Sequence, residues 1–131
     1  MAYKIMVVDD SATMRALIKR TLTMYGMEIE RLCEAGSGKA ALDLLTKESV
    51  DLILADINMP EMNGIEMAEQ VLANPATCRI PVVVVSTEAS QTRIQELKTI
   101  GVKGFIHKPF TPEQIRDVVV EILGACHAEH V

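Results

Sequence analysis

Five short runs of β-branched or otherwise apolar residues recur along the chain, at positions 4–8, 29–33, 51–55, 82–85 and 104–107. Three of them, 5–8, 52–55 and 82–85, are almost continuously apolar rather than alternating with polar residues. Continuous apolar runs of this length are typical of strands that are covered on both faces, as in a parallel sheet. The pattern therefore predicts five strands in a largely buried sheet.

Segments with helical periodicity separate the predicted strands. In each segment, apolar residues recur at three- and four-residue spacing, so one face is buried. The positions on these faces are Met14, Leu17, Ile18, Leu22 and Tyr25; Ala40, Ala41, Leu44 and Leu45; Ile65, Ala68, Val71 and Leu72; Ile94, Leu97 and Ile100; and Ile115, Val118, Val119 and Ile122. Gly26, Gly101 and Gly124 follow three of these helices and are expected to end them. Thr111 is the expected N-cap of the last helix, with Pro112 at its first position.

Strand and helix alternate five times, which predicts an α/β fold with a parallel sheet and right-handed crossovers. A length of 131 residues favours one domain. Hydrophobic residues make up 49% and charged residues 24% of the chain, as in an ordinary globular protein.

Charge and cysteine content exclude several classes of protein. The net charge of −5, without a block of like charges, argues against binding to nucleic acid or an anionic membrane. No apolar run approaches the ~20 residues that span a bilayer, and the first residues do not resemble a signal peptide. The three cysteines are widely spaced and form no CxxC pair, which favours reduced thiols in the cytoplasm. We expect a cytoplasmic monomer.

Polar residues follow each predicted strand. They are Asp9 and Asp10 after the first strand, Glu34 after the second, Asp56 and Asn58 after the third, Ser86 and Thr87 after the fourth, and Lys108 after the fifth. Ligands of open α/β sheets bind beyond the carboxyl ends of the strands, so these side chains should converge at one edge.

The chemistry of this set points to phosphoryl transfer. Clustered carboxylates repel each other unless a cation intervenes, and an all-oxygen site suits Mg²⁺. A carboxylate can itself be the nucleophile, while a lysine and a metal ion neutralise the transferred phosphoryl group. We therefore predict a Mg²⁺-dependent aspartyl-phosphate site.

Structural roles could explain some of the same residues. Asp10 could cap a helix that begins at Ser11, Ser86 and Thr87 could cap the following helix, and Lys108 could be a solvated turn lysine. The segment 36–39, Gly-Ser-Gly-Lys, suggests a phosphate-binding loop but fails the GxxxxGK[ST] pattern at two positions, which favours a helix-opening turn.

The combined motifs resemble the receiver domain of two-component response regulators. They are Asp9-Asp10, the block 56–64, the strand 82–85 that leads into Ser86, and Lys108-Pro109-Phe110, and the resemblance covers essentially the whole chain. The segment 9–15 and the length are most similar to stand-alone members of the chemotaxis type. The resemblance implies a flavodoxin-like (βα)5 doubly wound sheet of order 2-1-3-4-5. It also implies a receiver domain over residues 1–124 and a tail over 125–131.

The resemblance implies a role for each site residue. Asp56 would accept the phosphoryl group, Asp10 and Asp56 would bind Mg²⁺ through their side chains, Asn58 through its backbone carbonyl and Asp9 mainly through water. Lys108 would contact the phosphoryl group and form a cis peptide bond with Pro109. Ser86 would be the switch hydroxyl and Phe105 the aromatic residue that changes rotamer.

Three positions depart from the common pattern or leave a role open. Thr87 stands where many relatives have alanine, and Phe105 lacks the hydroxyl of the frequent tyrosine, so coupling to output would rest on packing. Glu61 adds a negative charge beside the site.

The expected function is that of a phosphorylation switch. A sensor histidine kinase would donate the phosphoryl group to Asp56, the chain would later hydrolyse it, and a phosphatase could assist. Output would be binding to a downstream protein, in chemotaxis the flagellar motor switch. A phosphorelay intermediate or phosphate sink, a phosphorylation-independent binding module and a flavin-binding protein are the alternatives. Asp9-Asp10 disfavours the last because it would repel a flavin phosphate.

Overall fold

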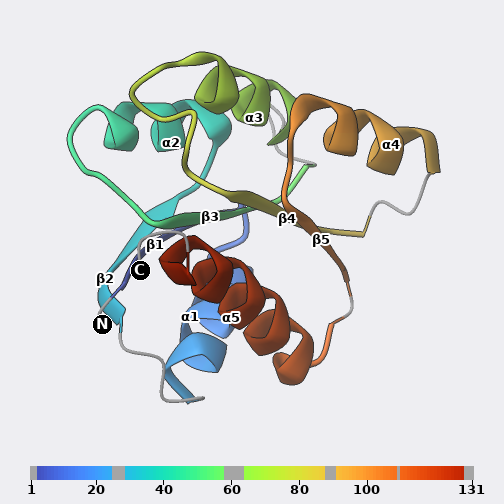
Figure 1. The fold of residues 1–131 in the computed structure, drawn as a ribbon. Helices are drawn as coiled ribbons and strands as arrows, with labels where there is room; N and C mark the ends of the chain where they lie inside the picture. The colour runs from blue at the N-terminus through green and yellow to red at the C-terminus, as the bar shows by residue number, and fades with distance from the viewer. Residues whose placement is uncertain (1–2, 25–28, 58–63, 88–90, 109, 129–131) are drawn as a thin grey trace.

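The computed structural model describes residues 3–24, 29–57, 64–87, 91–108 and 110–128 as an α/β domain (Figure 1). Its elements are β1 (Tyr3–Val8), α1 (Ala12–Met24), β2 (Ile29–Ala35), α2 (Gly38–Leu45), β3 (Leu52–Ala55), α3 (Gly64–Ala73), β4 (Val82–Ser86), α4 (Gln91–Ile100), β5 (Gly104–His107) and α5 (Pro112–Ala128). All strand pairs are parallel and the strand order is β2-β1-β3-β4-β5. The predicted fold class and strand order are confirmed.

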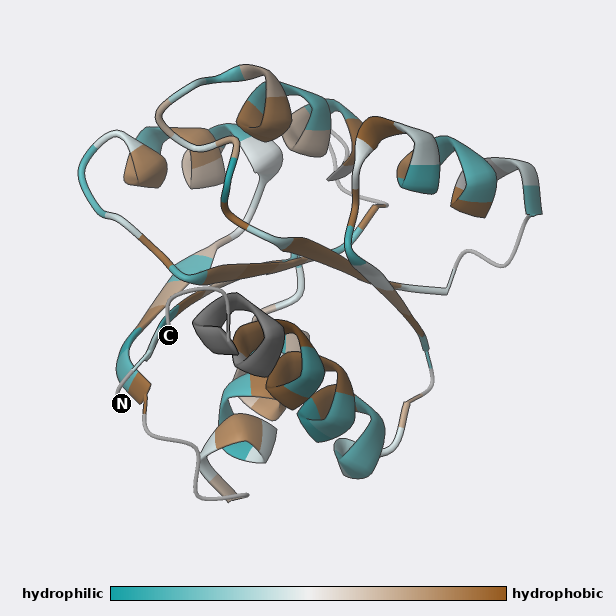
Figure 2. Cartoon of the chain, viewed as in Figure 1, coloured by the Kyte–Doolittle hydropathy of each residue, from teal (hydrophilic) through white to brown (hydrophobic). Residues whose placement is uncertain are grey.

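The helices form two layers around the sheet. Helices α1 and α5 cover one face, and α2, α3 and α4 cover the other (Figure 1). The apolar sides of the helices face the sheet, as the hydropathy colouring shows (Figure 2). Alternate residues of β1 serve the two layers, with Ile5 and Val7 in the α1/α5 core and Met6 and Val8 in the core on the α2/α3 side. The central strands are therefore buried on both faces, as the continuous apolar runs predicted.

A third, smaller core cluster lies under α3 and α4. Ile57, Ile65, Val84 and Leu97 form it, and Ile100, Val102 and Phe105 pack against it. Ile57 directly follows Asp56, so this cluster begins one residue from the predicted phosphoacceptor. We refer to these seven residues as the α4 cluster.

Two of the predicted helix boundaries are confirmed, the start of α5 after Thr111 and the end of α4 before Gly101. Thr111 Oγ1 accepts from Gln114 N and Gln114 Oε1 accepts from Thr111 N, which is a capping box at the start of α5. Gly101, with φ +107°, ends α4, while its N–H donates to Lys98 O and Val102 N–H donates to Leu97 O. This is a Schellman motif, whose left-handed position favours glycine.

Some expected boundaries are wrong. Helix α5 continues to Ala128, so Gly124 does not end it. A glycine inside a helix costs only about 1 kcal/mol relative to alanine, which the buried Leu123 and its neighbours can offset. Strand β2 extends to Ala35, and β3 begins at Leu52 rather than at Asp51, which is exposed and accepts a hydrogen bond from Lys4 N. The division of the chain at residue 124 stays a prediction, and the expected stop at Gly26 lies outside the described residues.

Candidate functional site

Asp9 is held at the end of β1 by the extension of the sheet. Its N–H donates to Ala35 O over 3.0 Å, which continues the β1–β2 ladder. One carboxylate oxygen accepts from Ser11 N at 2.9 Å, and the other accepts from Lys108 Nζ at 2.9 Å. Asp9 is only 2% exposed, and these hydrogen bonds satisfy its buried carboxylate oxygens.

Asp56 and Lys108 are placed by the neighbouring strands. Asp56 N donates to Val8 O at 2.9 Å, and Lys108 N donates to Ser86 O at 2.8 Å. The Lys108 ammonium group reaches back across the sheet edge to Asp56 Oδ2 at 3.2 Å as well as to Asp9. The predicted convergence of Asp9, Asp56 and Lys108 is therefore observed, and Lys108 is not a solvated turn residue.

Asp10 completes an acidic cluster of three carboxylates. Oxygen atoms of Asp9, Asp10 and Asp56 all lie within 4.8 Å of one another. Asp10 is exposed, whereas the other two are buried. We call Asp9, Asp10, Asp56 and Lys108 the acidic site. The helix-capping alternative for Asp10 is wrong, because Ser11 Oγ accepts from Met14 N at 3.2 Å and caps α1.

The acidic site has an excess of negative charge. Three carboxylates face one ammonium group, which leaves two negative charges when all are ionised. Burial alone would lower the pKa of Lys108, but the hydrogen bond to Asp9 and the charges of Asp56 and Asp9 outweigh it and raise that pKa. Lys108 therefore stays charged. A hard divalent cation bound by oxygen atoms would compensate the remaining charge, so the donor set fits a metal ion.

Ser86 and Phe105 lie on the adjacent strands β4 and β5. Ser86 is the last residue of β4, is completely buried and pairs in register with His107 of β5. Phe105 is partly buried against the α4 cluster. Thr87 is exposed, so of these two hydroxyl residues only Ser86 belongs to the buried sheet edge. Asn58, Glu61 and the Lys108–Pro109 peptide bond lie outside the described residues, and their roles stay predictions.

One residue of this edge was missed as a functional candidate. Arg15, in the first turn of α1, donates from Nη1 to Asp9 O at 2.5 Å and from Nε to Glu34 Oε1 at 3.3 Å. The available signals were its position four residues after the helix-capping Ser11 and the acidic Glu34 near the end of the second strand. Glu34 lies inside β2 rather than after it.

A second polar cluster lies on β2, away from the residues of the acidic site. Glu48 accepts from the thiol of Cys33 at 2.9 Å and pairs with Arg31 at 2.6 Å. Burial, with the Glu48 hydrogen bond, raises the pKa of Cys33 from 9.0 to about 11. We call Arg31, Cys33 and Glu48 the Glu48 cluster. Cys33 is therefore a protonated thiol of low reactivity at neutral pH.

The segment 36–39 has the structural role that its failed motif indicated. Ser37 is the N-cap of α2, and its hydroxyl accepts from Ala40 N at 3.1 Å. Within the described ranges, no helix has both the length and the apolar character needed to cross a membrane.

Comparison with known proteins defines the family. Residues 5–120 match the model of the response regulator receiver domain. The chain is 41% identical over 127 residues to the chemotaxis protein CheY homolog of Campylobacter jejuni subsp. jejuni, a match that spans 96% of both sequences. The chain belongs to the response regulator receiver family.

Solved structures agree with this assignment. Chemotaxis response regulator CheY4 of Vibrio cholerae is 32% identical, with a TM-score of 0.83 over 93% of this chain and 99% of that chain. The phosphorylated cyanobacterial phytochrome response regulator RcpA is 28% identical, with a TM-score of 0.79 over 93% of this chain and 91% of that chain.

Proposed function

We propose that this protein is a cytoplasmic phosphorylation switch that accepts a phosphoryl group on Asp56. The observation that carries the proposal is the convergence of Asp9, Asp10 and Asp56 with Lys108 at one edge of the sheet. The likeness to a response regulator whose structure was solved in phosphorylated form supports it. Lys108 Nζ donates to Asp56 Oδ2 at 3.2 Å, so the proposed nucleophile faces the one ammonium group of the acidic site.

The donor would be the phosphohistidine of a sensor kinase. A carboxylate oxygen of Asp56 would attack phosphorus, the P–N bond to the imidazole would break, and the released histidine nitrogen would take up a proton. Lys108 would move from the carboxylates to a phosphoryl oxygen, where its charge offsets the negative charge of the transferred group. Hydrolysis of the acyl phosphate by water, alone or with a phosphatase, would restore Asp56.

Mg²⁺ would be held by Asp10 and Asp56, with Asp9 acting mainly through water and Asn58 through its backbone carbonyl. When bound, the ion supplies charge neutralisation for the phosphoryl group. Asp9 and Asp10 bring the required negative charge, and Lys108 limits their mutual repulsion.

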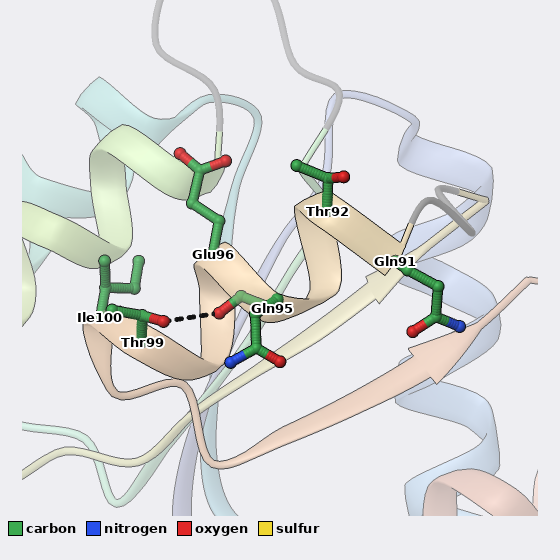
Figure 3. A pocket seen from close by; sticks show the side chains of 6 residues that line it. All are labelled: Gln91, Thr92, Gln95, Glu96, Thr99 and Ile100. Carbon is green, nitrogen blue, oxygen red and sulfur yellow. Dashed lines mark hydrogen bonds between the residues drawn. The ribbon is translucent and has the colours of Figure 1, made fainter.

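Output would pass through the α4 cluster. Ile57 joins this cluster to Asp56, and Phe105 and Ile100 pack against it from β5 and α4. Ile100 also lines an open hollow of about 590 Å³ over α4, together with Gln91, Thr92, Gln95, Glu96 and Thr99 (Figure 3). A change at Asp56 and Ser86 would thereby alter the surface of α4, β5 and α5, where a downstream protein would bind.

The similarity to chemotaxis proteins favours the flagellar motor switch as that downstream protein. Deletion of the gene should then change the reversal frequency of swimming cells, and the Asp56→Asn variant should fail to restore it. Unchanged reversals would instead favour a phosphorelay intermediate or phosphate sink, which transfer to histidine phosphotransfer proteins would detect. Restoration by Asp56→Asn would indicate a phosphorylation-independent binding module.

The direct test is intact mass after incubation with acetyl phosphate. The wild-type protein should gain one phosphoryl mass with Mg²⁺ and none with a chelator. Asp56→Asn should gain none under either condition. Asp43→Asn, which removes an exposed carboxylate from α2, is the matched control and should behave like wild type. A Mg²⁺-dependent mass gain in Asp56→Asn would move the phosphoacceptor to another residue.

A further inference from the structure

Arg15 closes a ring of hydrogen bonds around the β1–α1 turn. Its backbone N–H donates to Ser11 O at 3.1 Å, Ser11 N donates to Asp9 Oδ1 at 2.9 Å, and its guanidinium group donates to Asp9 O at 2.5 Å. Arg15 thus holds the turn at both ends, through Asp9 O at its start and through Ser11 O where α1 begins.

The guanidinium group is itself held in place. Its side chain is only 19% exposed, and Nε donates to Glu34 Oε1 on the neighbouring strand β2 at 3.3 Å. A Cβ atom added at Gly36 would lie 3.7 Å from Arg15 Nη1, so the group also lies close to the β2–α2 turn. Arg15 therefore connects α1, the end of β1 and β2.

The contact with Asp9 O restrains the Asp9–Asp10 peptide bond. A peptide unit is planar, so restraining the direction of its carbonyl group also restrains its N–H group and the Cα–Cα vector between the two residues. Asp9 and Asp10 are the residues on either side of this plane, and their carboxylates belong to the acidic site. The orientation of that plane contributes to where both carboxylates point, together with their side-chain torsions.

We propose that Arg15 is a positioning residue of the acidic site, which orients the Asp9–Asp10 peptide so that both carboxylates face the site of the divalent cation. This inference rests on the proposed phosphorylation function for its purpose, but it concerns metal binding, which can be measured without phosphorylation. Arg15 does not touch the reacting atoms. Its effect is transmitted through the backbone of Asp9.

If only the charge of Arg15 mattered, its removal would change the cation affinity in the opposite direction, so the direction of the change tests the proposal. Removing a positive charge near three carboxylates should strengthen cation binding if only the charge of Arg15 matters. If Arg15 positions the carboxylates, removing it should weaken cation binding despite the lower repulsion. Arg15→Lys keeps the charge but cannot form the same two-pronged contact with Asp9 and Glu34, so any loss in that variant comes from geometry.

The experiment is titration calorimetry of Mg²⁺ with wild type, Arg15→Lys, Arg15→Met and Arg20→Met. Arg20 is exposed on the same helix, so its variant removes an equal charge without touching the turn. We expect Mg²⁺ to bind about 3- to 10-fold more weakly to both Arg15 variants, and within about 2-fold of wild type to Arg20→Met. Unchanged or tighter binding to Arg15→Lys and Arg15→Met would overturn the proposal.

Unfolding in urea without Mg²⁺ separates positioning from general damage to the fold. A purely structural role would lower the free energy of unfolding while the folded fraction bound Mg²⁺ with wild-type affinity, which also overturns the proposal. If the wild-type protein itself fails to bind Mg²⁺, both this inference and the proposed function are wrong. If wild type binds Mg²⁺ and is phosphorylated but the Arg15 variants match it, only this inference is wrong.

Discussion

The acidic site and the Glu48 cluster are both partly buried groups of charged and polar side chains, yet their charge balance differs. In the Glu48 cluster, one carboxylate is matched by the Arg31 guanidinium and by the neutral Cys33 thiol. In the acidic site, three carboxylates lie together, and two of them, Asp9 and Asp56, pair with one ammonium group. The charges of the Glu48 cluster are balanced, whereas those of the acidic site leave a negative charge that a bound cation would offset. Excess negative charge, rather than burial or hydrogen bonding, is what distinguishes the acidic site from the Glu48 cluster.

The largest expected effect is that of removing the one ammonium group from the acidic site. Lys108→Met leaves the side chains of Asp9 and Asp56, which are 3% and 10% exposed, without their shared cation. Breaking a buried ion pair on one side costs about 3–5 kcal/mol, so we expect a loss of about 3 kcal/mol in the free energy of unfolding without Mg²⁺. Urea denaturation in a chelator measures it.

Two further variants check this assignment. Lys98→Met, at an exposed position in the last turn of α4, should cost less than about 1 kcal/mol. Adding Asp56→Asn to Lys108→Met should recover part of the loss, because one unpaired charge disappears. Equal losses for the two lysine variants would contradict the charge imbalance proposed for the acidic site.

Mg²⁺ should stabilise the protein through the acidic site and leave the Glu48 cluster unaffected. At a concentration 100 times its Kd, a ligand of the folded state adds about 2.7 kcal/mol, which corresponds to several degrees in the unfolding midpoint. Thermal unfolding with and without Mg²⁺ measures this shift. It should be much smaller in Asp10→Asn and unchanged in Glu48→Gln. An equal reduction in both variants would mean that the effect does not depend on the acidic site.

Because of the Glu48 cluster, the free energy of unfolding should depend on pH in the alkaline range. The folded state keeps the Cys33 proton up to about pH 11, whereas the unfolded chain loses it near pH 9.0. The folded state then binds more protons, so the free energy of unfolding should fall as the pH rises from about 9 to 11, by about 1–2 kcal/mol. Urea denaturation across this range should show a smaller slope for Cys33→Ala than for wild type. Equal slopes would show that Cys33 has a normal pKa.

The smallest expected effect comes from the ion pair of the Glu48 cluster. Glu48→Gln removes the charge but keeps an oxygen that can accept from Cys33, and the Arg31 side chain is 63% exposed. We expect a loss of about 0.5–1 kcal/mol in the free energy of unfolding at pH 7. A loss as large as that of Lys108→Met would remove the distinction between the two clusters.

The sequence predicted the residues of the acidic site better than the contacts that hold them. Asp9, Asp56 and Lys108 could be predicted because each follows an apolar run, and parallel strands bring their carboxyl ends to one edge. The hydrogen bond from Arg15 to Asp9 O could not, because it depends on how the first turn of α1 approaches the end of β1. The partner of Cys33 was equally hidden, since Glu48 lies in a connection without periodic pattern.

Helix ends show the same limit. Gly101 ends α4 where the chain needs a left-handed residue, whereas Gly124 is accommodated inside α5. Both glycines follow apolar helical patterns, so local sequence does not distinguish them. The difference lies in what comes next: Val102 turns back onto the α4 cluster beside Leu97, whereas the helix continues past Gly124 to Ala128.

The long-range contacts of Lys108 have a consequence for synthesis of the protein. Its two carboxylate partners lie 99 and 52 positions earlier in the chain. Contacts at such separations form late, because closing long loops costs entropy before the contact compensates it. A nascent chain whose β5 has not yet left the ribosome therefore lacks Lys108, the ion-pair partner of Asp9 and Asp56. The acidic site is therefore complete only after the fifth strand has docked onto the sheet.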